Sequence, residues 1–134
     1  GIADTLEEIF GLHPPTWLLA RQTTETILHL AELGRVILVG RGANLITAGL
    51  DRVFHVRLVG STAKRAARVQ KEKAVDEHKA LELIRQIDGG RARYVKQYFN
   101  RDVADPLLYN LVINTDSISS DQTAELIHRA LELG

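Results

Sequence analysis

Three short runs of β-branched and aliphatic residues constrain the fold of this chain more than any other feature. The runs at 36–39 and 111–114 are continuously apolar, as in parallel strands covered on both faces, and the run at 53–59 is more alternating. Helix-starting residues follow the second and third runs, Ser-Thr at 61–62 and Ser-Ser-Asp-Gln at 119–122. Because strands that alternate with helices need crossover connections, the pattern predicts an α/β fold with a parallel sheet and flanking helices.

Capping and breaking residues set the expected bounds of the helices. Apolar residues recur at helical spacing up to Leu33, and Gly34 follows where a left-handed cap is usual, so a helix is expected to end there. The proline pair at 14–15 limits this helix upstream. Asp76 is a plausible N-cap of a later, long helix. The glycine pair at 89–90 costs that helix about 1 kcal/mol per residue relative to alanine, so a hinge or break is expected.

Size and composition are those of an ordinary globular protein. The 134 residues predict a single domain spanning 1–134, with 45% hydrophobic and 25% charged residues. The apolar runs are too short to span a bilayer, and the acidic N-terminus does not resemble a signal peptide. The absence of cysteine excludes disulfides and thiolate nucleophiles and favours a reducing, cytoplasmic location. A chain without methionine that begins with Gly1 suggests a fragment.

Positive charge is concentrated in the middle of a chain whose formal net charge is zero. Residues 61–101 contain eleven Lys or Arg and five Asp or Glu, so the rest of the chain carries the balancing negative charge. This asymmetry indicates either an anion bound at one place or a solvated helix face. The neutral net charge and the few aromatic residues argue against nucleic acid as a partner.

The segment V-I-L-V-G-R-G-A-N at 36–44 resembles a phosphate-binding loop, but the two standard loops are excluded. A dinucleotide fingerprint needs a third glycine where this chain has Leu45, and a P-loop needs a Gly-Lys pair, which occurs nowhere in the 134 residues. What remains is Arg41 between Gly40 and Gly42 at the expected end of a strand, where α/β folds bind ligands. The arginine fork matches a phosphate, and a plain turn with a surface arginine is the alternative.

Motifs for metal binding and for a serine nucleophile are absent from the sequence. The five histidines show no ligand spacing such as H-E-x-x-H, and no cysteine is present to complete a site. No G-x-S-x-G segment occurs. No metal site built by protein residues is therefore expected.

Four collinear segments resemble the cytidylate kinase-like family. They are V-I-L-V-G-R-G-A-N, S-T-A-K-R-A-A-R-V, I-D-G-G-R-A-R-Y-V-K-Q-Y-F and D-P-L-L-Y-N-L-V-I-N-T-D-S-I-S, and the likeness covers roughly residues 20 to 134. The family belongs to the nucleoside monophosphate kinases. The resemblance therefore implies a three-layer, P-loop kinase-like fold that transfers phosphate from ATP, with Mg²⁺, to CMP or a related nucleoside monophosphate.

The resemblance also implies roles for matched residues. Arg41 corresponds to the arginine that grips the acceptor's monophosphate, and a lid-like region is expected at about 61–101. Phosphoryl transfer needs position and positive charge, which arginines supply. The implied catalytic residues are Arg65, Arg68, Asp88 and Arg91, and the implied nucleotide-binding residues are Gly40, Arg41, Gly42 and Arg93.

The chain departs from the family pattern in three places. The P-loop and its strand are absent, Ile87 stands where relatives carry an arginine, and Asn110 stands where an acid is usual. In the parent fold the P-loop strand lies between the run ending at Gly40 and the run beginning near Val53. These two runs are therefore expected to be direct neighbours, unless they pair with another copy in a homo-oligomer or an N-terminal piece has been lost.

Three hypotheses for function follow. The first is a cytidylate kinase-like domain, either a fragment or a degenerate copy, which is not active alone because the P-loop groups are absent. The second is a non-catalytic nucleotide- or anion-binding regulatory module. The third is a structural or oligomerisation domain whose basic stretch is a solvated helix face.

Overall fold

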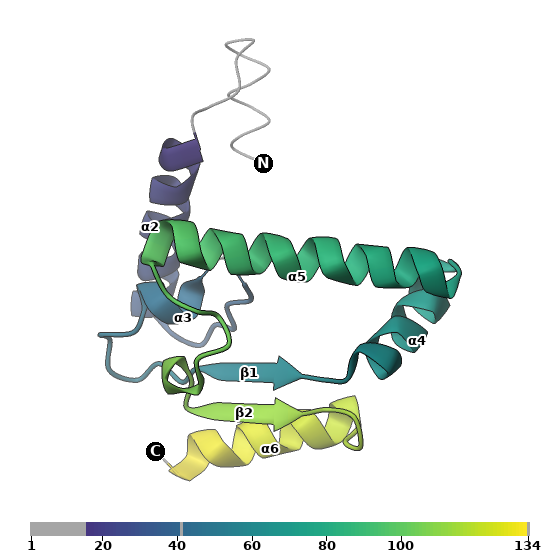
Figure 1. Cartoon of the computed structure of the whole chain (residues 1–134). Helices are drawn as coiled ribbons and strands as arrows, with labels where there is room; N and C mark the ends of the chain where they lie inside the picture. Colours follow the sequence, from purple (N-terminus) through teal and green to yellow (C-terminus); the bar gives the residue numbers. More distant parts are fainter. Residues whose placement is uncertain (1–15, 41, 134) are drawn as a thin grey trace. The chain divides into compact units, whose positions relative to one another are not determined.

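A computed structural model describes residues 16–40 and 42–133, and positions 1–15, 41 and 134 lie outside the described part (Figure 1). The chain divides into two compact units, Gly1–Val53 and Phe54–Gly134. No helix among the described residues is long and apolar enough to cross a membrane.

The described part of the first unit contains two helices, α2 (Thr16–Leu33) and α3 (Ala43–Ile46). Helix α2 ends at Leu33, as the sequence predicts, and it begins at Thr16, within the upstream limit that the proline pair sets. Gly34 has a positive φ of 72°, and its N–H donates to the Leu30 carbonyl at 3.1 Å, which confirms the predicted glycine cap.

The predicted strand at 36–39 is wrong. These residues are irregular, and Ile37 and Val39 are 89% and 87% exposed. A strand requires hydrogen bonds from a neighbour, and no described segment pairs with this run. The expected pairing of this run with the strand near Val53 is therefore wrong as well.

The second unit contains a two-stranded parallel sheet of β1 (Val56–Val59) and β2 (Leu111–Asn114), with Val56 opposite Leu111 and Val59 opposite Asn114. This arrangement confirms a mixed α/β fold with a small parallel sheet and flanking helices. The strand at 111–114 has the predicted bounds, whereas β1 is shorter than the predicted 53–59.

Asn110 links the two strands at the start of the sheet through hydrogen bonds to His55. Its side-chain Oδ1 accepts from the His55 N–H at 2.8 Å, while its own N–H donates to the His55 carbonyl at 2.7 Å. Asn110 is the position where the family resemblance leads one to expect an acid. An amide oxygen accepts this hydrogen bond as a carboxylate oxygen would, without adding a negative charge.

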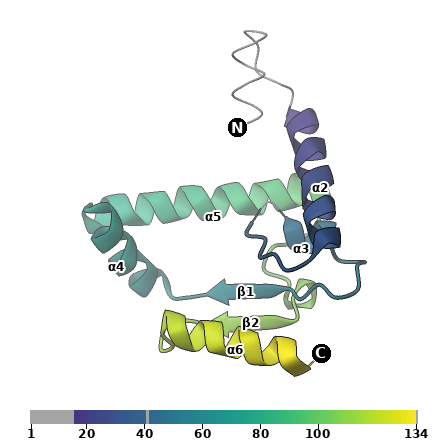
Figure 2. The same cartoon turned by 180° about the vertical axis from the view of Figure 1, so that it is seen from behind.

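The crossover between the strands consists of α4 (Thr62–Lys73), α5 (Glu77–Phe99) and a short 3₁₀ helix, η1 (Pro106–Leu108). The predicted caps are present: the Ser61 side chain accepts from the Lys64 N–H, and the Asp76 side chain accepts from the Lys79 N–H. Figures 1 and 2 show α5 and the C-terminal helix α6 (Ser120–Leu133) on opposite sides of the strand pair.

The start of α6 has the predicted capping box. The Ser119 Oγ accepts from the Gln122 N–H at 3.1 Å, and the Gln122 side chain accepts from the Ser119 N–H at 2.9 Å. Two backbone donors at the helix start are thereby satisfied.

The predicted hinge at the glycine pair is wrong, because α5 is continuous through 89–90. A Cβ added at Gly89 would lie 3.0 Å from the Arg93 Nη1. Buried Ile84 and Val95 anchor the helix on either side of the pair. We infer that this packing outweighs a glycine cost of about 1 kcal/mol per residue.

A small apolar core joins α4 to α5. Ala66, Ala80 and Ile84 are buried together, and Val69, Val75 and Leu81 pack against them. Alanines at this contact let the helix backbones approach closely. The core therefore fixes the side chains that project from the first turn of α4 and from the middle of α5.

Candidate functional site

The carboxyl ends of β1 and β2 meet the first turn of α4. The Thr115 Oγ1 donates to the Val59 carbonyl at 3.0 Å, and the Ser61 N–H donates to the Asp116 Oδ1 at 2.8 Å. A Cβ added at Gly60 would lie 3.2 Å from that Asp116 oxygen. A side chain at position 60 would therefore disturb the junction. Ligands of open α/β sheets bind outside this edge.

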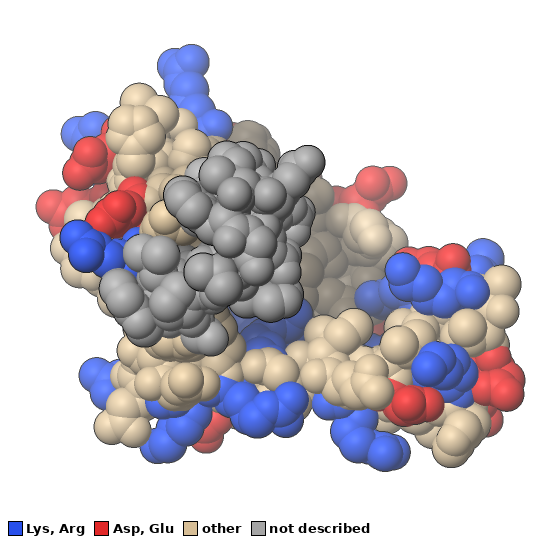
Figure 3. Space-filling model, turned by 90° about the horizontal axis from the view of Figure 1, so that it is seen from above, with Lys and Arg blue, Asp and Glu red and all other residues tan. Residues whose placement is uncertain are grey.

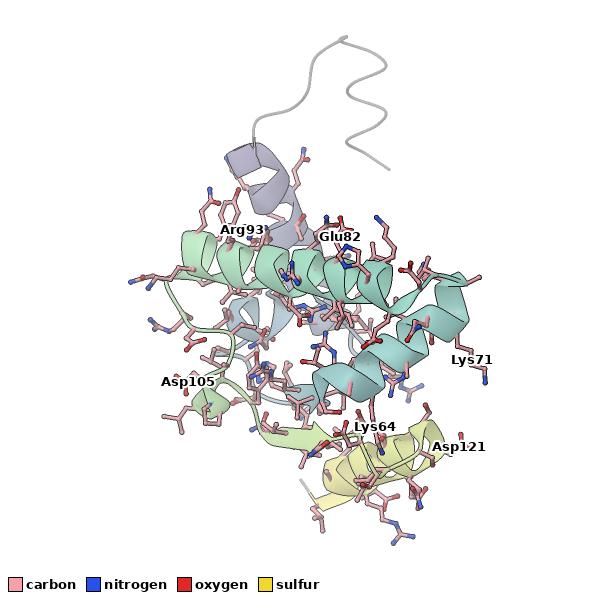
Figure 4. All side chains as sticks on the ribbon, turned by 45° about the vertical axis from the view of Figure 1, so that its right-hand side comes forward. Lys64, Lys71, Glu82, Arg93, Asp105 and Asp121 are labelled. Carbon is pink, nitrogen blue, oxygen red and sulfur yellow. The ribbon has the colours of Figure 1, made fainter. Side chains whose placement is uncertain are left out.

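Lys64, labelled on α4 in Figure 4, makes a second link across the junction. Its Nζ donates to the Asp116 carbonyl at 2.6 Å. The hydrogen bonds from Ser61 hold the pKa of the Asp116 carboxyl below its usual range, and the charges of Lys64 and Arg68 lower it further. The carboxylate therefore stays ionised beside the two cations.

Arg65 and Asp88 form a bidentate ion pair between α4 and α5. The Arg65 Nη1 and Nη2 each donate to one Asp88 oxygen at 2.7 Å. The bond with Arg65 holds the pKa of Asp88 below its usual range and raises the pKa of Arg65. Both side chains are about one-third exposed, at 33% and 40%, so solvent screening limits the pair to about 1 kcal/mol.

A third arginine, Arg57, projects from β1 toward the same region. Its guanidinium carbon lies 5.8 Å from the centre of the Tyr109 ring. Tyr109 donates from its hydroxyl to the Val103 carbonyl at 2.7 Å, and burial raises the pKa of Tyr109. Arg57 and Arg91 add to the effect of Arg65 in lowering the pKa of Asp88.

A hollow of about 480 Å³ lies beside the strand ends in the second unit. Its lining combines the charged Arg65 and Arg68 with the apolar Leu58, Ile118 and Ile127. The remaining lining residues are Val59, Gly60, Thr115, Ser119, Ser120, Thr123 and Ala124. Guanidinium groups suit an anionic group, and the apolar side chains suit a flat ring.

Positively and negatively charged side chains are mixed on the surface that Figure 3 presents. Figure 3 shows blue and red side chains interspersed on the face that it presents, rather than one basic side and one acidic side. The excess of positive charge in 61–101 therefore matters where particular arginines converge, as at Asp88.

The structure brings three of the predicted site residues together and separates others. Arg65 and Asp88 are bonded, and Arg91 acts on the same carboxylate. Arg68 lines the hollow, one turn after Arg65. Arg93 instead lies against Gly89 on α5.

The glycine-bracketed segment belongs to the first unit. Gly40 and Gly42 both have positive φ angles, 75° and 69°, which favour glycine. Arg41, the predicted monophosphate clamp, lies outside the described residues.

Sequence reasoning missed Arg57, Tyr109, Lys64 and Asp116. Arg57 stands in the otherwise apolar run Val56–Val59, and a charged residue inside a half-buried strand is a signal that could have marked it. Asp116 gave no such signal, because its role depends on a contact with Ser61 across 55 positions of sequence.

The described residues do not form a magnesium site. No group of three or more His, Cys, Asp or Glu among them could hold a metal ion. Both Asp88 oxygens are bonded to Arg65, and one Asp116 oxygen is bonded to the Ser61 N–H. These contacts leave little room for the several oxygen ligands that Mg²⁺ prefers.

Comparison with known proteins identifies the family. The model of the cytidylate kinase-like family matches residues 13–117, and the chain therefore belongs to that family. The match confirms the resemblance on which the kinase interpretation depends.

Two curated proteins are similar to parts of the chain. A cytidylate kinase of Methanopyrus kandleri is 32% identical over 110 residues, which cover 76% of this chain and 57% of that protein. A uronate isomerase of Corynebacterium glutamicum is 28% identical over 109 residues, which cover 81% of this chain and 21% of that protein. The chain thus spans little more than half of the first relative and a fifth of the second.

A solved structure shares the fold. An uncharacterized protein from Eubacterium ventriosum superposes with a TM-score of 0.82, at 21% sequence identity. The superposition covers 90% of this chain and 69% of the other. This likeness concerns the fold alone.

Proposed function

We propose that this chain supplies the arginine-rich, nucleotide-binding part of a kinase that transfers phosphate from ATP to CMP or a related nucleoside monophosphate. Family membership gives the reaction class. The single observation that carries the assignment to this site is the hollow at the strand ends, which Arg65 and Arg68 line together with apolar side chains.

Each arginine has a distinct part in this proposal. Arg65 uses one N–H of each terminal nitrogen to hold Asp88, and its further N–H donors remain for a phosphate oxygen. Arg68 is exposed and adds a second guanidinium to the hollow. Because the α4–α5 core and the Asp88 bond fix Arg65 in advance, binding a phosphate costs it little side-chain freedom.

The hollow fits a nucleotide such as ATP but not its metal. The apolar side suits the base, and the arginines would hold phosphates and stabilise the negative charge of a transferring phosphoryl group. Magnesium would neutralise phosphate charge when it is bound with the nucleotide. The described residues offer it no ligand set of their own.

The sequence favours one alternative, a module that binds nucleotides without turnover. No Gly-Lys pair occurs in the 134 residues, so these residues lack the lysine with which P-loop kinases hold the transferred phosphate. On this alternative CMP and ATP bind the 134-residue chain, but no CDP forms. Because the 134 residues are not expected to be active alone on either reading, the complete gene product is incubated with labelled ATP and CMP and the products are separated. CDP should form if the chain is part of a kinase, and none should form on the alternative.

Titration calorimetry with CMP and with ATP tests the nucleotide binding that both the kinase proposal and the non-catalytic alternative require. Arg68→Gln should weaken at least one of the two nucleotides about tenfold, because it removes a charged donor from the hollow. Arg129→Gln is the matched control, since Arg129 is exposed on α6 and pairs with Glu125. Absence of heat with both nucleotides, or equal losses in the two variants, would contradict the proposed site.

A further inference from the structure

Arg57 is the arginine that the family resemblance and the hollow leave unexplained. It is half-buried on β1, and its guanidinium lies over the Tyr109 ring. Among the residues that the structure describes, no hydrogen-bond acceptor lies against this guanidinium. A half-buried arginine usually has a carboxylate or carbonyl partner, because burying an unpaired charge is costly.

Asp88, a carboxylate on which the charge of Arg57 acts, does not supply that partner. Asp88 is close enough for Arg57 and Arg91 to lower its pKa, but both of its oxygens are bonded to Arg65. The charges of three guanidinium groups therefore act on one carboxylate, and Arg57 and Arg91 have no hydrogen-bonded carboxylate of their own among the described residues. Like charges held together repel unless an anion neutralises them.

Tyr109 keeps Arg57 in place for such an anion. The ring attracts the guanidinium through its electron-rich face, and the hydroxyl is bonded to the Val103 carbonyl, so the ring cannot turn away freely. A guanidinium that stacks on a ring retains its in-plane N–H donors, which can bond to phosphate oxygens.

We propose that Arg57 is a phosphate-contacting residue, which together with Arg91 forms an anion subsite beside the Arg65–Asp88 ion pair. The ligand is a phosphate or diphosphate group. This inference rests on the proposed function in that the group belongs to a nucleotide, but the subsite is defined by phosphate chemistry alone. It can therefore be tested with an anion that carries no base.

Calorimetry with inorganic pyrophosphate tests the subsite. The wild-type chain should bind pyrophosphate, Arg57→Gln should bind it about tenfold more weakly, and Arg129→Gln should match the wild type. Arg57→Lys keeps the charge but not the planar fork, so its affinity should lie between the wild type and Arg57→Gln. Wild-type affinity in Arg57→Gln, or no binding by the wild type, would overturn the inference.

Two further measurements keep the test decisive. If Arg57→Gln fails to fold, NMR of the wild type should show the Arg57 Nε–Hε signal shifting as pyrophosphate is added, and an unchanged signal would count against the subsite. Parallel titrations with CMP separate the two proposals. Arg57-dependent pyrophosphate binding without CMP binding would refute the nucleotide proposal only, whereas CMP binding together with pyrophosphate binding that is unchanged in Arg57→Gln would refute the subsite only.

Discussion

Two neighbouring parts of the second unit differ in whether their cationic side chains have carboxylate partners. At the strand ends, carboxylates neutralise the cations: Asp88 is bonded to Arg65, and Asp116 lies beside Lys64 and Arg68. Between β1 and α5, Arg57 and Arg91 have no such partner among the described residues. The difference indicates that the first group of cations orders the fold as well as lining the hollow, while Arg57 and Arg91 depend on a ligand for their neutralisation.

Asp88→Asn should give the largest effect, because it removes the carboxylate that the three guanidinium groups share. We expect the free energy of unfolding at pH 7 to fall by about 1–2 kcal/mol, measured by urea denaturation. Glu72→Gln, an exposed acid of α4, is the control and should change little. If Asp88→Asn is as stable as the wild type, the ion pair does not order the fold. The proposed difference between the paired cations and Arg57 with Arg91 would then be wrong.

The pH dependence of the stability difference between wild type and Asp88→Asn tests whether the Arg65–Asp88 ion pair is its source. The pKa of Asp88 is lowered on folding from an ordinary value of 3.8, so its stabilising contribution is present above that value and is lost as the pH falls through the lower folded pKa. The stability difference between wild type and Asp88→Asn should be full at pH 7 and vanish below the folded pKa. A difference that persists in acid would show that the ion pair is not its source.

Gly60→Ala disturbs the junction at the strand ends without removing a charge. The new methyl would lie 3.2 Å from an Asp116 oxygen and 3.4 Å from the Arg65 Cγ, so we expect a loss of about 1 kcal/mol in thermal or urea unfolding. Gly49→Ala is the matched control, because a Cβ there meets nothing within 4 Å. Equal stability of the two variants would mean that the junction is loosely packed.

The smallest expected change in stability comes from Arg57→Gln. It removes a cation that has no ion-pair partner among the described residues and relieves repulsion with Arg91, so the loss in urea denaturation should be below about 0.5 kcal/mol. Arg65→Gln, which breaks the Asp88 bond, should lose more, about 1 kcal/mol. Reversal of this order would place Arg57 with the residues that order the fold.

Local sequence signals predicted the helix boundaries well. Gly34, Ser61, Asp76 and Ser119 cap or end helices where the sequence placed these signals, because a cap depends on a few adjacent residues. The strand at 111–114 was equally clear, since β1 offers it a partner in register.

The failures concern interactions that adjacent residues do not determine. The run at 36–39 reads as a strand, but strand formation depends on a neighbour, and the described residues provide none. The glycine pair at 89–90 reads as a break, but packing around Ile84 and Val95 keeps α5 continuous. Arg57 was missed because its significance comes from Tyr109 and Asp88, which are distant in sequence.

The affinity of the 134-residue chain for CMP compared with cytidine tests the central claim most directly. The two ligands share a base and a sugar and differ in one phosphate, which the arginines of the second unit are proposed to bind. Calorimetry should show CMP binding at least about tenfold more tightly than cytidine, because charged hydrogen bonds to the phosphate are gained. Equal affinities, or no binding of CMP, would contradict the claim that this arrangement of arginines recognises a nucleoside monophosphate.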